Sequence, residues 1–405
     1  MIPDLEKQFD NLYSTFNKQN YPLEDLIVAV RIDSDNYAFA LHGNKPEAVT
    51  REIFVKQFPL LAKIFAEKSD RNVIVISKPK YALQAIAKDY DILPVLDDLP
   101  QIVGLQANLC DGNNTEQILS ALEKQDACLL ANHAECGNAV LAIGSSLALI
   151  TATVAIVEKS SQAMVEGELL GGAKPLPLEI CDFYRELYLS RYSKMDKSIE
   201  SLSAADYQRR ISDDEMILRQ ELVEFGNHLV EENLTQGTWG NLSVRLDDQY
   251  MLITPSGMAY SRLTPYDMVR VNYHDMTHEG KLAPSVEQGF HAAIYREHEK
   301  INGVIHTHSF NCSVFAAANK ALTITLPEAA ALLGNCSGYC SYAKAGSDEL
   351  AAGVSTAITD DVWSCIMGNH GMAVCGSSLP DTFERTILME KAARYHLDQL
   401  SLDNN

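Results

Sequence analysis

Apolar and polar positions alternate along the chain in patterns that predict strands followed by helices. The runs VIVIS (73–77) and GVIHTHS (303–309) are rich in β-branched residues, which is typical of buried strands. Each run is followed by an Ala-rich stretch with helical spacing, a hairpin and a final helix with apolar residues three or four apart. Strands and helices mixed in this order indicate an α/β or α+β layered architecture.

The second half of the chain has further predicted elements before its GVIHTHS strand. The stretch 224–234 has helical spacing, and 240–257 predicts two strands joined by an Asp-Asp turn. The stretch PSVEQGFHAAIY (284–295) predicts a helix. Ser285 is its expected N-cap, and Gln288, three residues later, would complete a capping box.

One sequence unit occurs twice in the chain. Residues 126–163 and 361–395 both contain an apolar run, an Asn-His pair, a second apolar run and Gly-Ser-Ser-Leu. In both copies, 14 residues separate that glycine from the glutamate of a Glu-Lys pair. The asparagine precedes the glycine by 12 residues in the first copy and by 7 in the second, which indicates a longer hairpin turn in the first.

The similarity between the copies extends upstream, where residues 72–87 align with 303–318. In this alignment Val75 and Ser77 stand at the positions of two histidines in the second copy. The first copy is therefore predicted to keep the framework without the imidazoles.

The repeat predicts two homologous domains, 1–196 and 211–405. The polar and charged residues 197–210 are expected to be a linker between them.

Composition narrows the class of protein. The net charge of -21 argues against nucleic acid and anionic membranes as partners. The first residues lack a basic segment followed by an apolar one, so we expect no signal peptide. The longest apolar run, 139–159, is broken by Gly-Ser-Ser, and its second half predicts a buried helix. Nine cysteines without a CxxC pair are typical of reduced thiols, so a cytoplasmic location is expected.

The candidate chemistry is concentrated in the second copy. On a strand, His306 and His308 would point to the same side and present two imidazoles to one point, as a metal ion requires. His370, in a Gly-Asn-His-Gly turn, is the candidate third ligand. The alternatives are a surface pair of histidines and an ordinary turn histidine.

A carboxylate and a further histidine accompany these candidates. Glu287 is predicted in the first turn of its helix, where the helix dipole favours a carboxylate that acts as a base or a metal ligand. The alternative is a glutamate that only starts the helix. His291 lies one turn further along the same face, and packing is the favoured interpretation for it.

With these residues in order, the second half of the chain resembles the class II aldolase/adducin family. The resemblance implies two tandem class II aldolase-like domains, each a central mixed or antiparallel sheet flanked by helices. The first is then a degenerate copy, in which Val55 falls near the position of Glu287. The motifs of the resemblance are TWGNLSVR (238–245), ITPSG (253–257), PSVEQGFHAAIY (284–295), HTHS (306–309), YAKAGSDEL (342–350) and NHG (369–371).

The resemblance also implies roles for single residues. A divalent metal ion, zinc or another, would be held on His306, His308 and His370, one ion per chain, and Glu287 would be the catalytic acid/base. The residues matching the family's phosphate-binding positions are small, which suits an uncharged anion nest. They are Thr238, Gly240, Asn241, Ser256, Gly257 and Ser285.

The implied activity is that of a metal-dependent aldolase-type lyase in carbohydrate metabolism. It would cleave or form a C–C bond in a small hydroxylated carbohydrate, with or without a phosphate, through a metal-stabilised enediolate. Ala283, Val286, Pro327 and Ala345 depart from the family pattern. They leave open an epimerase, a decarboxylase or a dehydratase of the same fold. A non-enzymatic adducin-like interaction module is the second alternative.

Proteins of this family commonly form ring tetramers with active sites between subunits. The resemblance therefore implies a homodimer, or a higher homo-oligomer, in which two chains supply four domains and the degenerate copy forms a wall of the pocket. The alternative is a first domain that only adds solubility or binds something else.

Overall fold

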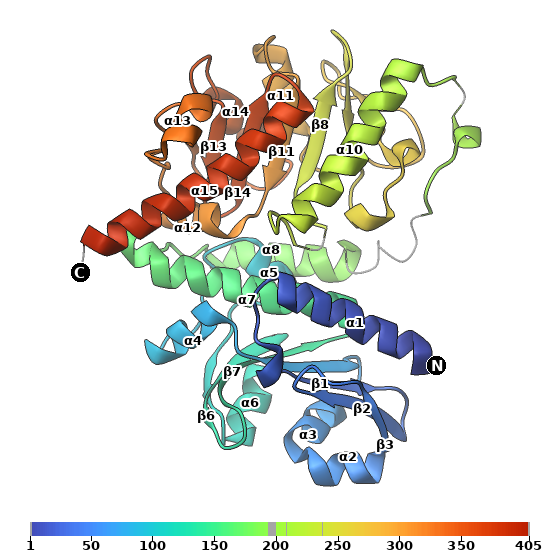
Figure 1. Cartoon of the computed structure of the whole chain (residues 1–405), viewed down its shortest axis with the longest axis vertical. Coiled ribbons are helices and arrows are strands. Elements are labelled where there is room, and N and C mark those ends of the chain that lie inside the picture. Colours follow the sequence, from blue (N-terminus) through green and yellow to red (C-terminus); the bar gives the residue numbers. More distant parts are fainter. Residues whose placement is uncertain (1, 193–199, 208, 237, 404–405) are drawn as a thin grey trace. The chain divides into compact units, whose positions relative to one another are not determined.

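The computed structural model describes residues 2–192, 200–207, 209–236 and 238–403 (Figure 1). These residues form two compact units. One contains the chain up to Val165 together with Pro175–Glu186, and the other contains Glu166–Lys174 and the chain from Leu187 onward. The predicted boundaries at 196 and 211 stay predictions, and residues 197–199 and 208 of the predicted linker lie outside the described residues.

Within the described residues, each unit is built on one seven-stranded sheet, and the order of strands is the same in both: β3-β2-β1-β4-β7-β6-β5 and β10-β9-β8-β11-β14-β13-β12. The pairs β5–β6 and β12–β13 are parallel and the others antiparallel, so the sheets are mixed as predicted. The shared order confirms the tandem duplication and shows that the first copy keeps the whole sheet. The strands are β1 (Ile27–Arg31), β2 (Asn36–Leu41), β3 (Glu47–Thr50), β4 (Val73–Ser77), β5 (Leu109–Asp111), β6 (Ala127–His133), β7 (Gly137–Gly144), β8 (Asn241–Arg245), β9 (Tyr250–Ile253), β10 (Val269–Asn272), β11 (Gly303–Thr307), β12 (Gly338–Cys340), β13 (Ser364–Met367) and β14 (Gly371–Gly376).

The helices follow the predicted alternation with strands. In the first half they are α1 (Ile2–Lys18), α2 (Arg51–Gln57), α3 (Pro59–Glu67), α4 (Lys80–Ala87), α5 (Asp98–Ile102), α6 (Thr115–Ala121), α7 (Leu147–Gly167) and α8 (Leu178–Leu187). In the second half they are α10 (Asp213–Glu231), α11 (Gln288–Glu297), α12 (Phe310–Ala318), α13 (Pro327–Leu333), α14 (Asp348–Ala357) and α15 (Leu379–Asp403).

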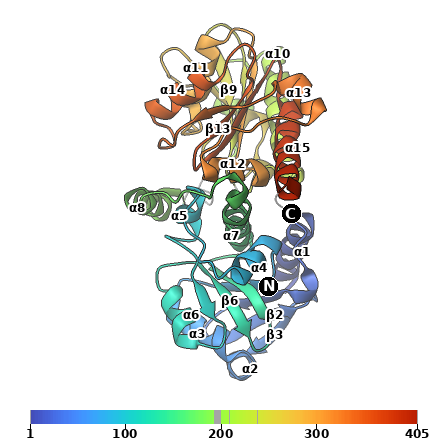
Figure 2. The same ribbon diagram turned by 90° about the vertical axis from the view of Figure 1, so that its left-hand side faces the viewer.

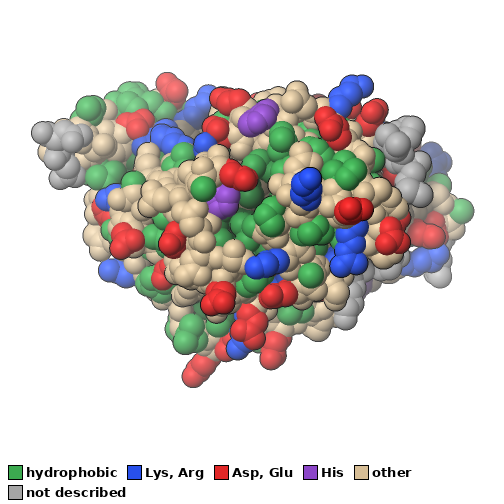
Figure 3. All heavy atoms as spheres, turned by 90° about the horizontal axis from the view of Figure 1, so that it is seen from below, with side chains coloured by type: hydrophobic (Ala, Val, Ile, Leu, Met, Phe, Trp, Pro, Cys, Tyr) green, Lys and Arg blue, Asp and Glu red, His purple; other side chains and the backbone are tan. Residues whose placement is uncertain are grey.

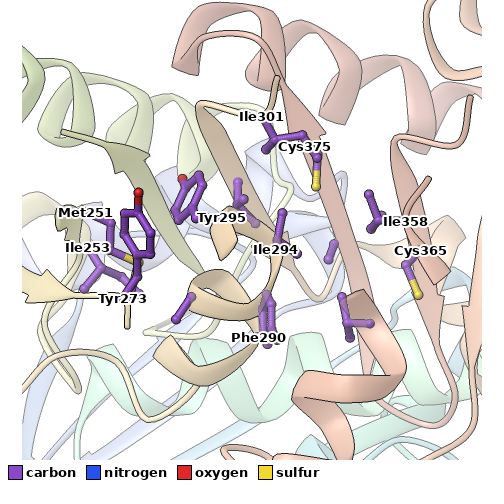
Figure 4. Packing of buried hydrophobic residues seen from close by; sticks show 14 of the residues in the cluster. Met251, Ile253, Tyr273, Phe290, Ile294, Tyr295, Ile301, Ile358, Cys365 and Cys375 are labelled. Carbon is purple, nitrogen blue, oxygen red and sulfur yellow. The ribbon is translucent and has the colours of Figure 1, made fainter. Parts of the chain in front are cut away.

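In the second unit, helices cover both faces of the sheet (Figure 2). Helices α10 and α15 pack on the face to which Ile305 of β11 contributes. Helices α11 and α14 pack on the opposite face, where Phe290, Ile294 and Tyr295 of α11 meet Cys365 and Cys375 of the sheet (Figure 4). Because strand side chains alternate between faces, His306, the residue after Ile305, is directed toward α11.

The repeated Glu-Lys pair has a structural role in both units. Glu158 of α7 accepts two hydrogen bonds, each 2.8 Å long, from backbone N–H groups at the start of α4. Glu390 of α15 does the same for α12, with lengths of 2.7 and 3.0 Å. Each glutamate therefore satisfies donors that the first turn of an earlier helix, α4 or α12, leaves without a partner in that helix.

The strand pairing corrects the sequence alignment of the two copies by one residue. Gly144 pairs with Val73, and the equivalent Gly376 pairs with Gly303. With the glycines matched, Ile76 and Lys78 occupy the positions of His306 and His308, rather than Val75 and Ser77. The apolar run in β4 carries no residue that marks its register, so a shift of one residue left the sequence match almost unchanged. The conclusion that the first copy lacks these imidazoles is unaffected.

The apolar run that follows Gly-Ser-Ser is the buried helix α7, as predicted, with Ile150, Val154 and Val157 inaccessible to solvent. Within the part of the chain that is described, no helix combines the length and apolar character needed to cross a membrane. All nine cysteines are free. Acidic side chains are spread over the face shown in Figure 3 and do not gather in one patch.

Candidate metal centre

Three histidines meet in the second unit, as the sequence predicted. His306 lies on β11, His308 directly follows this strand, and His370 lies in the turn between β13 and β14. All three are buried, and their candidate ligand atoms lie within 4.8 Å of one another. The Nε2 atoms of His306 and His308 are 3.0 Å apart, and the rings of His306 and His370 are stacked with centroids 4.9 Å apart.

Close pairing of β11 with β14 brings the third histidine to the other two. Thr307 pairs with Met372, two residues after His370. A Cβ atom on Gly371 would lie 2.5 Å from the carbonyl oxygen of Thr307 and 3.2 Å from Cε1 of His306, so this close approach requires glycine. Asn369 adopts a left-handed conformation with φ 53°, which asparagine tolerates better than most residues.

The three imidazoles fit a divalent metal ion. Nδ1 of His306 lies 2.8 Å from the carbonyl oxygen of Met372, to which it donates, so Nε2 is the ring nitrogen that faces the other two histidines. Metal-binding histidines are generally oriented by such a hydrogen bond from the second nitrogen. Three imidazoles beside a carboxylate form a donor set suited to zinc and to similar divalent ions. Within the described residues this is the one cluster of three such side chains found.

Glu287 completes the cluster. Its Oε1 lies 2.9 Å from Nε2 of His370 and its Oε2 lies 3.2 Å from Nε2 of His306. Burial opposes ionisation of this carboxyl, but the charges of His306 and His370 outweigh it and hold the pKa of Glu287 well below its usual range. A buried carboxylate in this position can act as a base or contact the metal.

The predicted helix start was wrong by two residues. Glu287 occupies the N-cap position of α11, and Ser285 does not. The chain is still paired with the 254–256 segment at this point, through the bridge of Pro284 to Pro255 and the hydrogen bond from the Ser285 backbone N–H to Thr254. The Ser285 hydroxyl instead accepts a hydrogen bond from the backbone N–H of Glu287 at 3.3 Å.

Four further buried residues form hydrogen bonds that lead away from Glu287. Asn241 Nδ2 donates to Glu287 Oε2 at 2.9 Å, and Asn241 Oδ1 lies 2.5 Å from Nε2 of His291. Nδ1 of His291 lies 2.6 Å from the hydroxyl of Ser243, which lies 2.8 Å from the hydroxyl of Tyr295. Burial, then the charge of His306, lower the pKa of His291 to about 3, so this ring is neutral. His291 therefore does more than the packing favoured by the sequence.

The predicted phosphate-binding residues lie in three adjoining segments. Ser256 donates its backbone N–H to Ala283, so the Ser256–Gly257 turn lies beside the segment that contains Ser285. Thr238 and Gly240 lie just before β8. Thr254, next to the Ser256–Gly257 turn, forms two hydrogen bonds with Leu242 of β8 and so connects this strand to the turn. Thr238 is exposed, whereas Asn241 is buried against Glu287. The assignment of a phosphate to these residues stays a prediction.

A segment from between the two copies contacts the turn that carries His370. The backbone N–H of Lys174 donates to Ala317 at 2.7 Å, and its carbonyl accepts from the side chain of Asn369 at 2.6 Å. In the same part of the chain, Glu166 forms an ion pair of 2.7 Å with Arg394. These contacts were not predicted, because Glu166–Lys174 lies within the range assigned to the first domain.

In the first unit, only one of the three positions equivalent to the centre still carries a histidine, His133. Lys78, at the His308 position, forms an ion pair of 2.7 Å with Asp25. His133, at the His370 position, turns its Nδ1 toward the backbone N–H groups of Glu135 and Cys136, at 3.2 and 3.3 Å. These side chains satisfy local partners and do not form a metal-binding cluster.

The glutamate also has no counterpart in the first unit. Helices α3 and α11 both end six residues before the following strand, and this match puts Gln57 at the position of Glu287 in place of the expected Val55. A cavity of about 200 Å³ lies here, lined among others by Ile27, Phe58, Leu61, Ile76 and His133. The first copy thus keeps a hollow at the equivalent place, lined by both apolar and polar residues.

The second half of the chain is similar to known proteins. A family model described as "Class II Aldolase and Adducin N-terminal domain" matches residues 220–397. An L-fuculose phosphate aldolase of Methanococcus maripaludis is 32% identical over 174 residues, which cover 43% of this chain and 93% of that protein. The corresponding enzyme of Escherichia coli K12 is 31% identical over 185 residues, which cover 46% and 85%. A solved structure of an L-fuculose 1-phosphate aldolase is 29% identical, covers 48% of this chain and 91% of its own, and has a TM-score of 0.45.

Proposed function

The chain belongs to the class II aldolase and adducin family, and from this premise we propose that it is a cytoplasmic, metal-dependent aldolase-type lyase. Its substrate is a small hydroxylated carbohydrate, with sugar phosphates as the first class to test, because relatives above 30% identity are L-fuculose phosphate aldolases. The observation that carries the proposal is the buried group of three imidazoles with a carboxylate 2.9 and 3.2 Å from two of them.

In this proposal the residues have separate roles. His306, His308 and His370 hold one divalent ion per chain, zinc or another. Such an ion, when bound, supplies Lewis acidity toward a carbonyl and a neighbouring hydroxyl, and with it stabilisation of an enediolate. Glu287 takes up and returns a proton, since its lowered pKa keeps it ionised and ready to accept one. The hydroxyl and N–H groups at Ser256, Gly257 and Ser285, with those at Thr238, Gly240 and Asn241, receive the anionic group of the substrate.

The test of the proposal is a C–C cleavage assay on L-fuculose 1-phosphate. We expect the zinc-loaded protein to release a three-carbon ketose phosphate, chelator treatment to abolish the release, and added zinc to restore it. Phosphorus NMR of the reaction mixture measures the product directly.

Assays of the same protein also distinguish the lyase from the other enzymes of this fold and from a non-enzymatic module. Epimerase, decarboxylase and dehydratase activities should be scored in parallel across sugar phosphates and sugar acids. Absence of C–C cleavage across the whole panel, with one of these activities present, would replace the lyase by that enzyme. An interaction module would show no turnover at all, and it would have no evident use for the buried histidines.

For assembly, we propose a homodimer in which two chains supply four domains to a closed ring. The degenerate copy then has a role without chemistry of its own, as a wall of the neighbouring active site. Light scattering of the full-length chain is expected to give twice the mass of one 44.7 kDa chain. A monomer that keeps full turnover at nanomolar concentration would show that the ring is unnecessary.

A further inference from the structure

We propose that His291 is a positioning residue, which together with Ser243 and Tyr295 fixes the amide of Asn241 so that it donates to Glu287. This inference deepens the proposed function and rests on it in one respect: it takes Glu287 as the group that moves the proton.

The four residues form a continuous buried chain between one strand and one helix. Asn241 and Ser243 are two apart on β8, so both side chains point to the same face of the sheet. His291 and Tyr295 are four apart on α11, on one side of that helix. The exposed fraction of each of the four side chains is between 0% and 3%, and the distances along the chain from Glu287 are 2.9, 2.5, 2.6 and 2.8 Å.

The chemistry of the end group sets one direction for all these hydrogen bonds. The NH₂ group of Asn241 faces Oε2 of Glu287 and donates to it at 2.9 Å. The oxygen of Asn241 then faces His291, whose Nε2 must be the N–H donor. The neutral ring has one N–H, so its Nδ1 accepts from the Ser243 hydroxyl, and Ser243 accepts from Tyr295. The reverse direction would place the amide oxygen of Asn241 2.9 Å from the carboxylate.

Without the histidine, the Glu287 carboxylate would be the one group in this chain that selects an orientation of the amide. An asparagine side chain presents an oxygen or an NH₂ group after a rotation of half a turn. The N–H of His291 removes one of these orientations. The carboxylate of Glu287 therefore keeps a fixed donor on Oε2, while its Oε1 faces His370.

The first copy shows that the fold does not need these polar groups. The strand pairing puts Ile27 and Ala29 at the positions of Asn241 and Ser243, and the matched helices put Leu61 and Phe65 at those of His291 and Tyr295. All four are apolar.

A conserved contact supports the helix match. Arg31 donates to the carbonyl of Phe65, as Arg245 does to that of Tyr295. The same framework thus packs without the polar chain where the metal-binding histidines are absent. We infer that the polar chain serves the site.

The test compares two variants of the zinc-loaded, full-length protein. His291→Gln keeps one acceptor and one donor, and His291→Leu keeps the approximate volume without either. We expect kcat to fall by ~10- to 100-fold in the leucine variant, with KM and metal content nearly unchanged, and to recover most of that loss in the glutamine variant. A leucine variant that folds, binds zinc and keeps wild-type kcat would overturn the proposal.

A second readout needs no substrate. In ¹⁵N-histidine NMR, His291 of the wild type should be a neutral ring protonated at Nε2, the nitrogen that faces Asn241 Oδ1. A ring protonated at Nδ1 alone overturns the proposal, including the case in which His291→Leu does not fold. If the wild type proves inactive on every substrate, the proposed function fails, but the tautomer result still decides the chain of hydrogen bonds.

Discussion

Replacing Glu287 by glutamine is expected to lower turnover by ~10²–10⁴-fold, the range of a lost general acid/base, with the metal still bound. Glutamine keeps the size of the side chain and can still accept from Asn241, whose amide lies 2.9 Å from Oε2. It cannot take up a proton at neutral pH, which is the function we propose for the carboxylate. Steady-state kinetics on the substrate identified among the sugar phosphates and sugar acids measures turnover, and elemental analysis of the same sample measures the bound metal.

A matched control is available close by. Glu299 is an exposed glutamate just beyond the end of α11, and Glu299→Gln removes the same charge without touching the site. We expect this variant to keep wild-type turnover. If Glu287→Gln also kept it while retaining zinc, Glu287 would have no part in the proton transfer.

The wild-type chain is expected to bind one metal ion, and His308→Ala is expected to bind none after dialysis. The three imidazoles are the one such cluster in the described part of the chain, and the loss of any of them leaves two protein nitrogens. Changes to groups that only orient a ligand already cost about 10- to 100-fold in metal affinity. We therefore expect more than a ~100-fold loss here, measured by chelator competition.

The first copy provides the control for this experiment. His133 stands where the second copy has His370, but it contacts its own turn, so His133→Ala should leave the metal content at one per chain. Two tightly bound ions in the wild type, or loss of metal in His133→Ala, would show that the first copy binds metal as well.

Much of the fold could be read from the sequence because its signals are local. The runs of β-branched residues, the helical spacing after them and the repeated Gly-Ser-Ser-Leu and Glu-Lys elements predicted the strands, helices and duplication. The HxH pattern on a strand predicted two of the three histidines from backbone geometry alone, since side chains two apart share a face.

Other features were missed although a signal was present. The pairs Asn241/Ser243 and His291/Tyr295 have the spacing of one strand face and one helix face, and each was visible in its motif. Neither pair indicates a partner by itself. A buried polar group only acquires a role once the element opposite it is known, because its hydrogen bonds decide whether burial is tolerated.

What the sequence by itself determined is the set of elements, the repeat and the residue types able to bind a metal. What only the tertiary structure decided is which of these residues meet. Pairing of β11 with β14 corrected the alignment of the copies by one residue, and it joined His370 to His306 and His308. Such contacts link residues more than 60 positions apart, and they depend on strand register, in which a shift of one residue turns every side chain to the other face. Local periodicity is unchanged by that shift, so it could not have fixed the register.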